Sequence, residues 1–371
     1  MGGHRGVAAK LALPTCSMDI SNIKRILITR TDRIGDVILS LPTIKATREA
    51  FPDAYIAMMV SPRISELVCA NPSLNEVIIY DKKKQKGIFK LLSFVKELKK
   101  KRFDIALILH STVRVNLLCF LAGIPKRIGY ERGKMDFLLT DGLEDIKRMG
   151  EKHEAEYSLD ILRYLGVAAK LALSKVEGLA LPVLSIKKED EERINKLLKA
   201  RGLNEGERFV ILHPCASCIS KMWPYENFAK VGDSIIQDFG MRVIINLHPD
   251  QVGMGEKVRS LMKNEPIFLC DKTTLGELSA LFKKASLVIS NDSGPAHIAS
   301  LVATAVISIF GRNQKGLSPV RWKPLGDKSI ALHKDVGCAE CLAHNCKKGF
   351  LCLKAITPEE VLKEAGKLLA V

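Results

Sequence analysis

The sequence predicts an α/β protein made of two doubly wound domains that face each other across a cleft. Short apolar runs alternate with amphipathic segments of helical spacing along most of the chain. With 371 residues the chain exceeds what one hydrophobic core usually supports, which favours two domains. A charged segment at 187–201 separates two series of such strands and helices. Ligands are therefore expected in the crevice at the carboxyl ends of the strands.

The first series is expected to form an N-terminal domain over 18–180, after an extension at 1–17 that lies outside the fold. Its first strand is 25–29, and a helix over 37–50 follows in which Pro42 marks a kink or a restart. The other expected elements are strands at 54–60, 76–80 and 104–109 and helices over 82–102 and 114–121. The octapeptide GVAAKLAL occurs twice, at 6–13 and 166–173, and is too short to be a structural repeat unit.

The second series is expected to form a C-terminal domain over 208–356 that carries a cysteine-rich tail. A linker and the charged helix fill 181–207, and a closing helix occupies 357–371. The expected strands are 209–212, 242–246, 267–270, 287–290 and 306–310, and the expected helices are 226–238, 275–284 and 296–301.

The loop after the strand at 287–290 has the features of an anion site. Asn291 to Pro295 are all turn-forming residues, and a short helix follows them. A strand, a Gly-containing loop and a helix N-terminus together direct backbone N–H groups and a positive dipole end at one point, which suits a phosphate or diphosphate. An ordinary strand-to-helix turn has the same pattern, and His297 has a structural reading as well as a ligand-binding one. The candidate residues are Asp292, Ser293, Gly294, Pro295, Ala296 and His297.

Two further loops hold candidate site residues, and each follows the first expected strand of a domain. Arg33, Gly35 and Asp36 come after the strand at 25–29, where Asp36 is either the N-cap of the next helix or a carboxylate that takes a proton in the cleft. Ser217 and Lys221 come after the strand at 209–212, where Lys221 is either a phosphate ligand or a solvated surface charge. Trp223 is expected to serve packing.

The net charge of +16 is concentrated in the N-terminal domain. Its densest part is the run from Lys82 to Arg102, whose middle has the spacing of a basic amphipathic helix. Lys99, Lys100 and Lys101 belong to this run and are expected on the acceptor side of the site. A merely solvated face is one interpretation, and contact with an anionic membrane or an acidic acceptor is another. Nucleic acid is disfavoured because the run lacks interleaved aromatic residues and no binding motif accompanies it.

The ten cysteines are scattered, which indicates a reduced cytoplasmic setting rather than a disulfide scaffold. No apolar run is long enough to span a membrane, and the first residues do not form a convincing signal peptide. Four thiols near the C-terminus are dense enough for zinc but lack a two-knuckle spacing, so reduced packing thiols are favoured. These are Cys338, Cys341, Cys346 and Cys352.

Three segments carry a family resemblance: TRTDRIGDVILSLPTIKATREAFPDA, the pair HPCAS and KMWP, and SNDSGPAHIA. From about residue 24 onward the chain resembles the bacterial heptosyltransferases of lipopolysaccharide core synthesis. The resemblance implies a GT-B fold, ADP-L-glycero-D-manno-heptose as donor in the C-terminal domain, and a phosphorylated, lipid-linked core sugar as acceptor against the N-terminal one. It implies an inverting transfer without metal or cofactor. Together with the cysteines and the basic charge, it predicts a cytoplasmic enzyme with peripheral contact at the anionic inner membrane and no nucleic-acid partner.

The resemblance also assigns roles. Asp36 matches the general base, Lys221 the lysine on the donor phosphate, and Asp292 the carboxylate that holds the heptose, while the loop from Ser293 meets the diphosphate. Glu256 is our candidate for the donor ribose, in a segment that departs from the family's Gly-rich form. Two alternatives remain: a GT-B transferase or epimerase with another nucleotide sugar, and a non-enzymatic module that binds nucleotide or nucleic acid.

Overall fold

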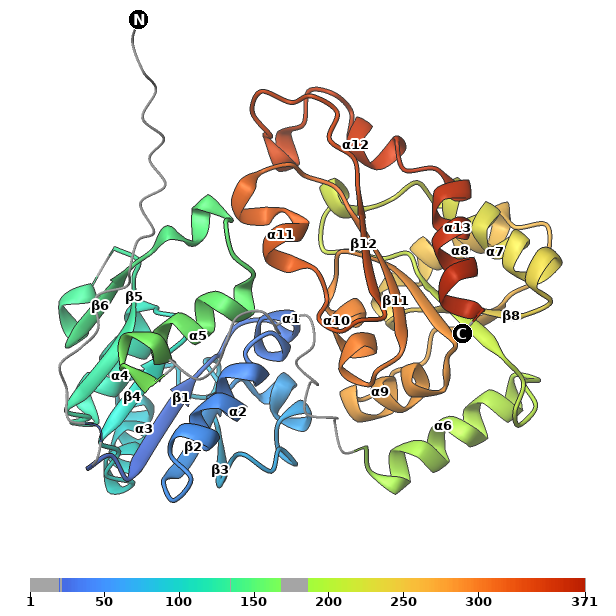
Figure 1. Ribbon diagram of the computed structural model, residues 1–371. Coiled ribbons are helices and arrows are strands. Elements are labelled where there is room, and N and C mark those ends of the chain that lie inside the picture. Colours follow the sequence, from blue (N-terminus) through green and yellow to red (C-terminus); the bar gives the residue numbers. More distant parts are fainter. Residues whose placement is uncertain (1–19, 21, 134, 168–185, 371) are drawn as a thin grey trace, which may run out of the picture.

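Two parallel six-stranded sheets form the two domains (Figure 1). The computed structural model describes residues 20, 22–133, 135–167 and 186–370. The first sheet has the strand order β3-β2-β1-β4-β5-β6 and the second the order β12-β11-β10-β7-β8-β9. Helices cover both faces of each sheet, so the prediction of two doubly wound α/β domains is confirmed.

In the N-terminal domain the first strand, β1, lies between β2 and β4 in the sheet. Residue Thr29 pairs with Met59 on one side and Ile108 on the other, so the chain leaves the middle of the sheet at Arg30. The strands are β1 Arg25–Thr29, β2 Tyr55–Val60, β3 Glu76–Ile79, β4 Ile105–Ile108, β5 Lys126–Glu131 and β6 Asp141–Glu144. The helices are α1 Ile34–Ile38, α2 Leu41–Ala50, α3 Ile88–Lys100, α4 Val113–Leu121 and α5 Glu154–Tyr164, with short 3₁₀ segments between them.

The structure of this domain differs from the prediction in three respects. The helix expected over 37–50 begins at Ile34 and restarts at Leu41, with Pro42 in the first turn of the restart. The basic helix begins only at Ile88, because Gly87 before it has φ +102, outside the helical region. Strands β5 and β6 and helix α5 were not predicted, since the sequences KRIGYE and DGLE mix charged with apolar residues.

The C-terminal domain repeats the design, with β10 between β11 and β7. Its strands are β7 Phe209–His213, β8 Arg242–Asn246, β9 Ile267–Leu269, β10 Leu287–Asn291, β11 Ala305–Phe310 and β12 Ser329–His333. Its helices are α6 Lys188–Ala200, α7 Tyr225–Phe239, α8 Val252–Leu261, α9 Leu275–Lys284, α10 Gly294–Leu301, α11 Pro319–Trp322, α12 Leu351–Lys354 and α13 Pro358–Leu369. Strand β12 and helices α8, α11 and α12 were not predicted. The expected linker at 178–185, the extension at 1–17 and nearly all of the repeated octapeptides lie outside the described residues.

The two domains pack on each other as well as on themselves. One cluster of buried apolar side chains includes Ile28 of β1 and Val37 of α1 together with Ile298 of α10 and Val288 of β10. Glu66 of the N-terminal domain accepts hydrogen bonds from the first amides of α9, Leu275 N at 3.0 Å and Gly276 N at 3.3 Å. Figure 1 shows α1 facing α10 where the domains meet. In the part of the chain that the structure describes, no helix is both long and apolar enough to cross a membrane.

Candidate active site

The predicted halves of the site meet where α1 and α10 touch. Gly35 lies so close to the ring of His297 that an added Cβ would be 2.7 Å from the His297 Cδ2 atom. A second close approach involves Gly294, the first residue of α10. An added Cβ on Gly294 would lie 3.4 Å from the Cβ of Ile34, the first residue of α1. The close approach explains the glycine at position 35, because any side chain there would push the domains apart.

Asp36 is held by a buried arginine rather than by a helix terminus. Arg33, not Asp36, is the N-cap of α1, so the N-cap interpretation of Asp36 is wrong. Instead the Asp36 Oδ1 atom accepts from the Arg30 Nη2 atom at 2.7 Å. The Arg30 Nε atom donates to the Asp32 Oδ1 atom at 2.9 Å, and the arginine is only 2% exposed.

The electrostatic surroundings of Asp36 favour proton uptake. Burial raises the pKa of its carboxyl group, and Arg30 opposes that shift only in part. Burial likewise lowers the pKa of both neighbouring imidazoles, His110 and His297, to about 4. Both histidines are therefore neutral near pH 7, and the carboxylate is the group of this cluster suited to accept a proton.

Across the interface, Asp292 binds two cations. Its Oδ2 atom lies 2.7 Å from the Lys221 Nζ atom and 3.0 Å from the Arg312 Nη2 atom. Lys221 also donates to the Asp292 carbonyl oxygen at 3.2 Å. The three charges sum to +1 beside the start of α10, where the helix dipole adds further positive potential. This is the composition that an anion requires.

Arg312 was missed by the sequence reading. It follows β11, which is adjacent to β10, so its position after a strand end was the available signal. It is buried and has φ +59, a left-handed conformation that is unusual for a residue with a side chain and clusters at functional sites. Its Nε atom is buried and has no hydrogen-bond partner.

The loop at the start of α10 differs in one respect from the expectation. The Ala296 amide donates to the Ser293 carbonyl oxygen at 3.2 Å, so it is not among the donors available to an anion. Pro295 has no amide proton, and the Ser293 hydroxyl lies 3.1 Å from the Ser290 hydroxyl. The amides of Ser293 and Gly294 remain as candidates from the predicted set.

Asn291, also missed, ties this loop to the one that carries Lys221. Its Oδ1 atom accepts from the Trp223 amide at 3.0 Å, and its Nδ2 atom donates to the Pro214 carbonyl oxygen at 2.8 Å. Trp223 is buried, as expected, and its indole donates to the Ile356 carbonyl oxygen at 2.9 Å. Burial raises the pKa of the Cys215 thiol to about 12, which leaves that thiol protonated and inert.

Several predicted residues are not part of this cluster. Ser217 is exposed, and so is Glu256, whose described partner is Arg259 of the same helix at 3.6 Å. Arg33 is exposed beside α1. Lys101 pairs with Glu76 at 2.5 Å, at the first residue of β3, and accepts at its carbonyl oxygen from Arg25. Lys99, Lys100 and Lys101 therefore lie at the amino ends of the strands, opposite the edge that bears Asp36.

The cysteine-rich tail provides no metal site among the residues that the structure describes, because no three His, Cys, Asp or Glu side chains are grouped for coordination. All four of its thiols are half-buried and free, and the Cys346 sulfur accepts from the Phe350 amide at 3.4 Å.

Comparison with known proteins decides the family. Residues 91–351, well over half of the chain, match the model of glycosyltransferase family 9 (heptosyltransferase). The chain belongs to glycosyltransferase family 9. It is thus a glycosyltransferase, and the family resemblance inferred from its motifs is confirmed.

Related family 9 proteins align over nearly their whole length. Lipopolysaccharide heptosyltransferase 3 of Escherichia coli K12 is 26% identical over 342 residues, which cover 90% of this chain and 95% of that protein. The lipopolysaccharide core heptosyltransferase OpsX of Haemophilus influenzae is 28% identical over 84% of this chain and 85% of its own.

Solved structures agree in fold. A family 9 glycosyltransferase from Veillonella parvula superposes with a TM-score of 0.82 at 25% identity, covering 94% of this chain and 97% of that one. The Escherichia coli ADP-heptose lipopolysaccharide heptosyltransferase II gives 0.72 at 22% identity, over 94% and 99% of the two chains. The Escherichia coli heptosyltransferase WaaC, solved with ADP, gives 0.66 at 15% identity, over 93% and 99%. The predicted GT-B fold is confirmed.

Proposed function

We propose that this glycosyltransferase moves a heptose from ADP-L-glycero-D-manno-heptose to the inner core of lipopolysaccharide, with inversion at the anomeric carbon. The observation that carries the proposal is the meeting of Asp36 with the Lys221, Asp292 and Arg312 cluster across the contact between Gly35 and His297. A proton acceptor from one domain and an anion site from the other lie around the same residue, His297, and a single displacement requires both. The names of the family 9 relatives supply the heptose, the lipopolysaccharide and the ADP.

In the proposed reaction Asp36 takes the proton of the acceptor hydroxyl as that oxygen attacks the anomeric carbon. The bond from that carbon to the β-phosphate oxygen breaks, and its electron pair leaves with ADP. Asp36 ends protonated and the new glycosidic bond lies on the face opposite the departed phosphate. The raised pKa of Asp36 makes it a stronger base than an exposed aspartate.

In the proposed reaction the C-terminal domain stabilises the negative charge of the departing ADP. Lys221 and Arg312 share Asp292. We expect Lys221 to turn to the diphosphate when the donor binds, while Arg312 keeps Asp292 in place for the heptose hydroxyls. The Ser293 and Gly294 amides and the α10 dipole add to the positive potential at the leaving group.

We also propose that the enzyme is cytoplasmic and touches an anionic membrane surface through the start of α3. Ile88 is 60% exposed, Phe89 84% and Leu92 45%, next to the lysines at 82–84, 86 and 90. This segment follows the carboxyl end of β3, so it lies at the same sheet edge as Asp36. Exposed apolar side chains ringed by lysines suit a membrane interface. This segment replaces Lys99–Lys101 as the expected contact.

The direct test is to incubate the protein with ADP-heptose and a panel of truncated core acceptors and to weigh the products. A mass gain of one heptose on one acceptor, lost in Asp36→Asn, supports the proposal. Transfer from another nucleotide sugar, or ADP-heptose left intact with every acceptor, would overturn it.

A further inference from the structure

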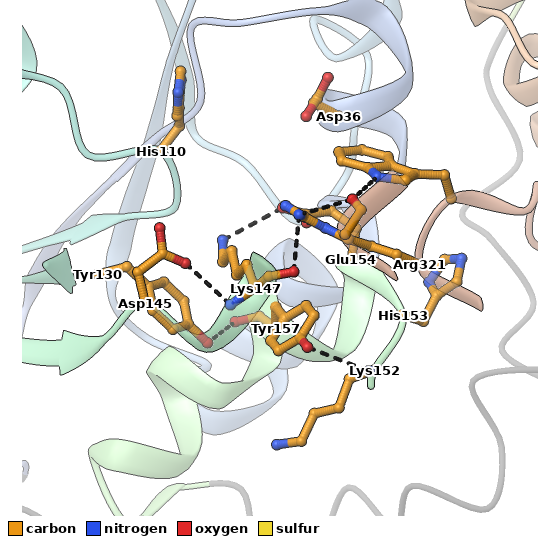
Figure 2. Close-up of polar contacts among 12 residues, drawn as sticks. Asp36, His110, Tyr130, Asp145, Lys147, Lys152, His153, Glu154, Tyr157 and Arg321 are labelled. Atoms are coloured by element: carbon orange, nitrogen blue, oxygen red, sulfur yellow. Dashed lines mark hydrogen bonds and ion pairs between the residues drawn. The ribbon is translucent and has the colours of Figure 1, made fainter. Parts of the chain in front are cut away.

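Glu154, the first residue of α5, is a buried carboxylate to which the proposed reaction gives no role. It is 1% exposed and pairs with three cations, Arg30, Lys147 and Arg321, of which Figure 2 labels the last two. Its Oε1 atom accepts from Arg30 Nη1 and Nη2, both at 3.0 Å, and from Lys147 Nζ at 3.4 Å. Its Oε2 atom accepts from Arg321 Nε at 2.8 Å and lies 2.7 Å from Arg321 Nη2.

The two oxygens of Glu154 serve different domains. Arg30 and Lys147 belong to the N-terminal domain and use Oε1, whereas Arg321 lies on α11 of the C-terminal domain and uses Oε2. Around this contact Arg321 Nη1 donates to the Lys147 carbonyl oxygen at 3.0 Å, and the ring of His153 reaches the Lys323 carbonyl oxygen at 2.9 Å. Oε2 is therefore satisfied by a cation only while α11 is docked on α5.

Arg30 connects Glu154 to the proposed base. A guanidinium has five N–H donors in one rigid plane, and Arg30 divides them among the carboxylates of Glu154, Asp36 and Asp32 and the Leu109 carbonyl oxygen. The Nη2 group alone serves both Glu154 Oε1 at 3.0 Å and Asp36 Oδ1 at 2.7 Å. Any change in how firmly Glu154 binds Arg30 changes how firmly Arg30 binds Asp36.

The charges around the cluster determine the direction in which Glu154 shifts the pKa of Asp36. Asp36 faces Arg30, Asp32 and Glu154, and beyond them the neutral rings of His110 and His297. Burial alone would raise the pKa of Glu154, but Lys147, Arg30 and Arg321 hold it well below its usual range, so the group is charged at neutral pH. Burial lowers the pKa of Lys147 to about 8, against the pull of Glu154. The negative charge of Glu154 raises the pKa of Asp36.

We propose that Glu154 is a positioning residue. Through it, the docking of Arg321 determines how strongly Arg30 binds and orients the Asp36 carboxylate. The inference rests on the proposed role of Asp36 as base. When α11 docks, Arg321 neutralises part of the Glu154 charge and leaves Arg30 free to orient the Asp36 carboxylate. When α11 withdraws, Glu154 draws Arg30 toward itself, and Asp36 loses its orientation. The carboxylate is thereby oriented toward the acceptor only in the docked arrangement of the domains.

Two substitutions separate this role from a purely structural one, because they shift the acidic limb of the kcat/KM pH profile in opposite directions. Glu154→Gln removes a negative charge near Asp36, so the midpoint of the limb should fall by about 0.5 pH unit or more. Arg321→Met removes the cation that offsets Glu154, so the midpoint should rise. Asp160→Asn on the same helix is the matched control, since Asp160 is a buried carboxylate with two cation partners, Lys152 and Arg163, and no bond to Arg30. It should leave the midpoint unchanged.

A second readout needs no substrate. Titration of the Asp36 carboxyl by carbon-13 NMR of aspartate-labelled protein, with Asp36→Asn to identify the signal, should show the same opposite shifts. Equal midpoints in parent, Glu154→Gln and Arg321→Met, or shifts of the same sign, would overturn the inference. If Glu154→Gln does not fold, Arg321→Met still decides, because Arg321 lies at the rim with 15% of its side chain exposed. If the parent transfers no heptose, the proposed function fails while the NMR titration still tests the linkage.

Discussion

Replacing Gly35 by Ala tests how closely the two halves of the site must approach each other. The added Cβ would lie 2.7 Å from the His297 Cδ2 atom and 3.0 Å from its Nε2 atom, whereas ordinary contact begins at 3.4 Å. The helices α1 and α10 must therefore separate by roughly 0.7 Å, or the enzyme must hold a strained contact that costs about 1–3 kcal/mol. Because His297 is buried, its ring has little room to move aside.

A displacement of this size at a bimolecular reaction centre reduces the rate by about 10- to 100-fold. We expect that loss in kcat for heptosyl transfer, with ADP affinity by calorimetry close to the parent value because the donor cluster lies wholly in the C-terminal domain. Gly253→Ala in α8 is the control, since an added Cβ there meets nothing within 4 Å. A Gly35→Ala enzyme with parental kcat and parental thermal stability would refute the reasoning.

Three other predictions concern single parts of the site. Asp36→Asn should lower kcat by about 100-fold or more while ADP binding is kept, and near-parental turnover would remove Asp36 as the base. Lys221→Ala should weaken ADP-sugar binding and slow transfer together, because it faces phosphate charge before and during departure; a change confined to acceptor KM would place it in the other half of the site. Replacing the three lysines at 82–84 by Ser should reduce sedimentation with anionic vesicles by about tenfold or more, at up to about 1 kcal/mol per lysine. The same change at 99–101 should leave vesicle binding nearly intact, and the reverse ranking would contradict the proposed contact.

Much of the fold could be predicted from the sequence because buried parallel strands are short, continuous apolar runs. The runs at β1, β7 and β10 have this character and were found within a residue of their observed ends. β5 and β6 were missed because KRIGYE and DGLE have charged residues at both ends and only short apolar stretches between them. The order of strands along each sheet is set by tertiary packing, so the spacing of apolar residues within a segment does not predict it.

The site residues likewise divide into those that local sequence predicts and those that only tertiary packing brings together. Asp36, Lys221 and Asp292 were found because each follows a strand end, and such ends converge at one edge of a parallel sheet. The partners of Glu154 could not be found in this way, since Arg30 lies 124 residues before it and Arg321 lies 167 residues after it.

The error over the basic run has a different origin. Counting charge along 82–102 gave no direction to the helix, and α3 runs antiparallel to the strands beside it. Its first turn is therefore at the carboxyl edge of the sheet and Lys99–Lys101 are at the far end. A charge total is a property of the chain, whereas the side of the domain on which the charge acts is set by the fold.

The position of Trp322 gives the enzyme a built-in optical signal. The chain has two tryptophans, of which Trp223 is sealed in the core of the C-terminal domain. Trp322 ends α11, with the Arg321 guanidinium 4.6 Å from its ring centre and its indole N–H donating to the Gly316 carbonyl oxygen. Undocking of α11 from α5 takes away the neighbouring carboxylate and admits water, so the emission of Trp322 should move to longer wavelength while that of Trp223 stays constant. Intrinsic fluorescence would therefore report undocking of α11 from α5 in real time, without a label and without the acceptor.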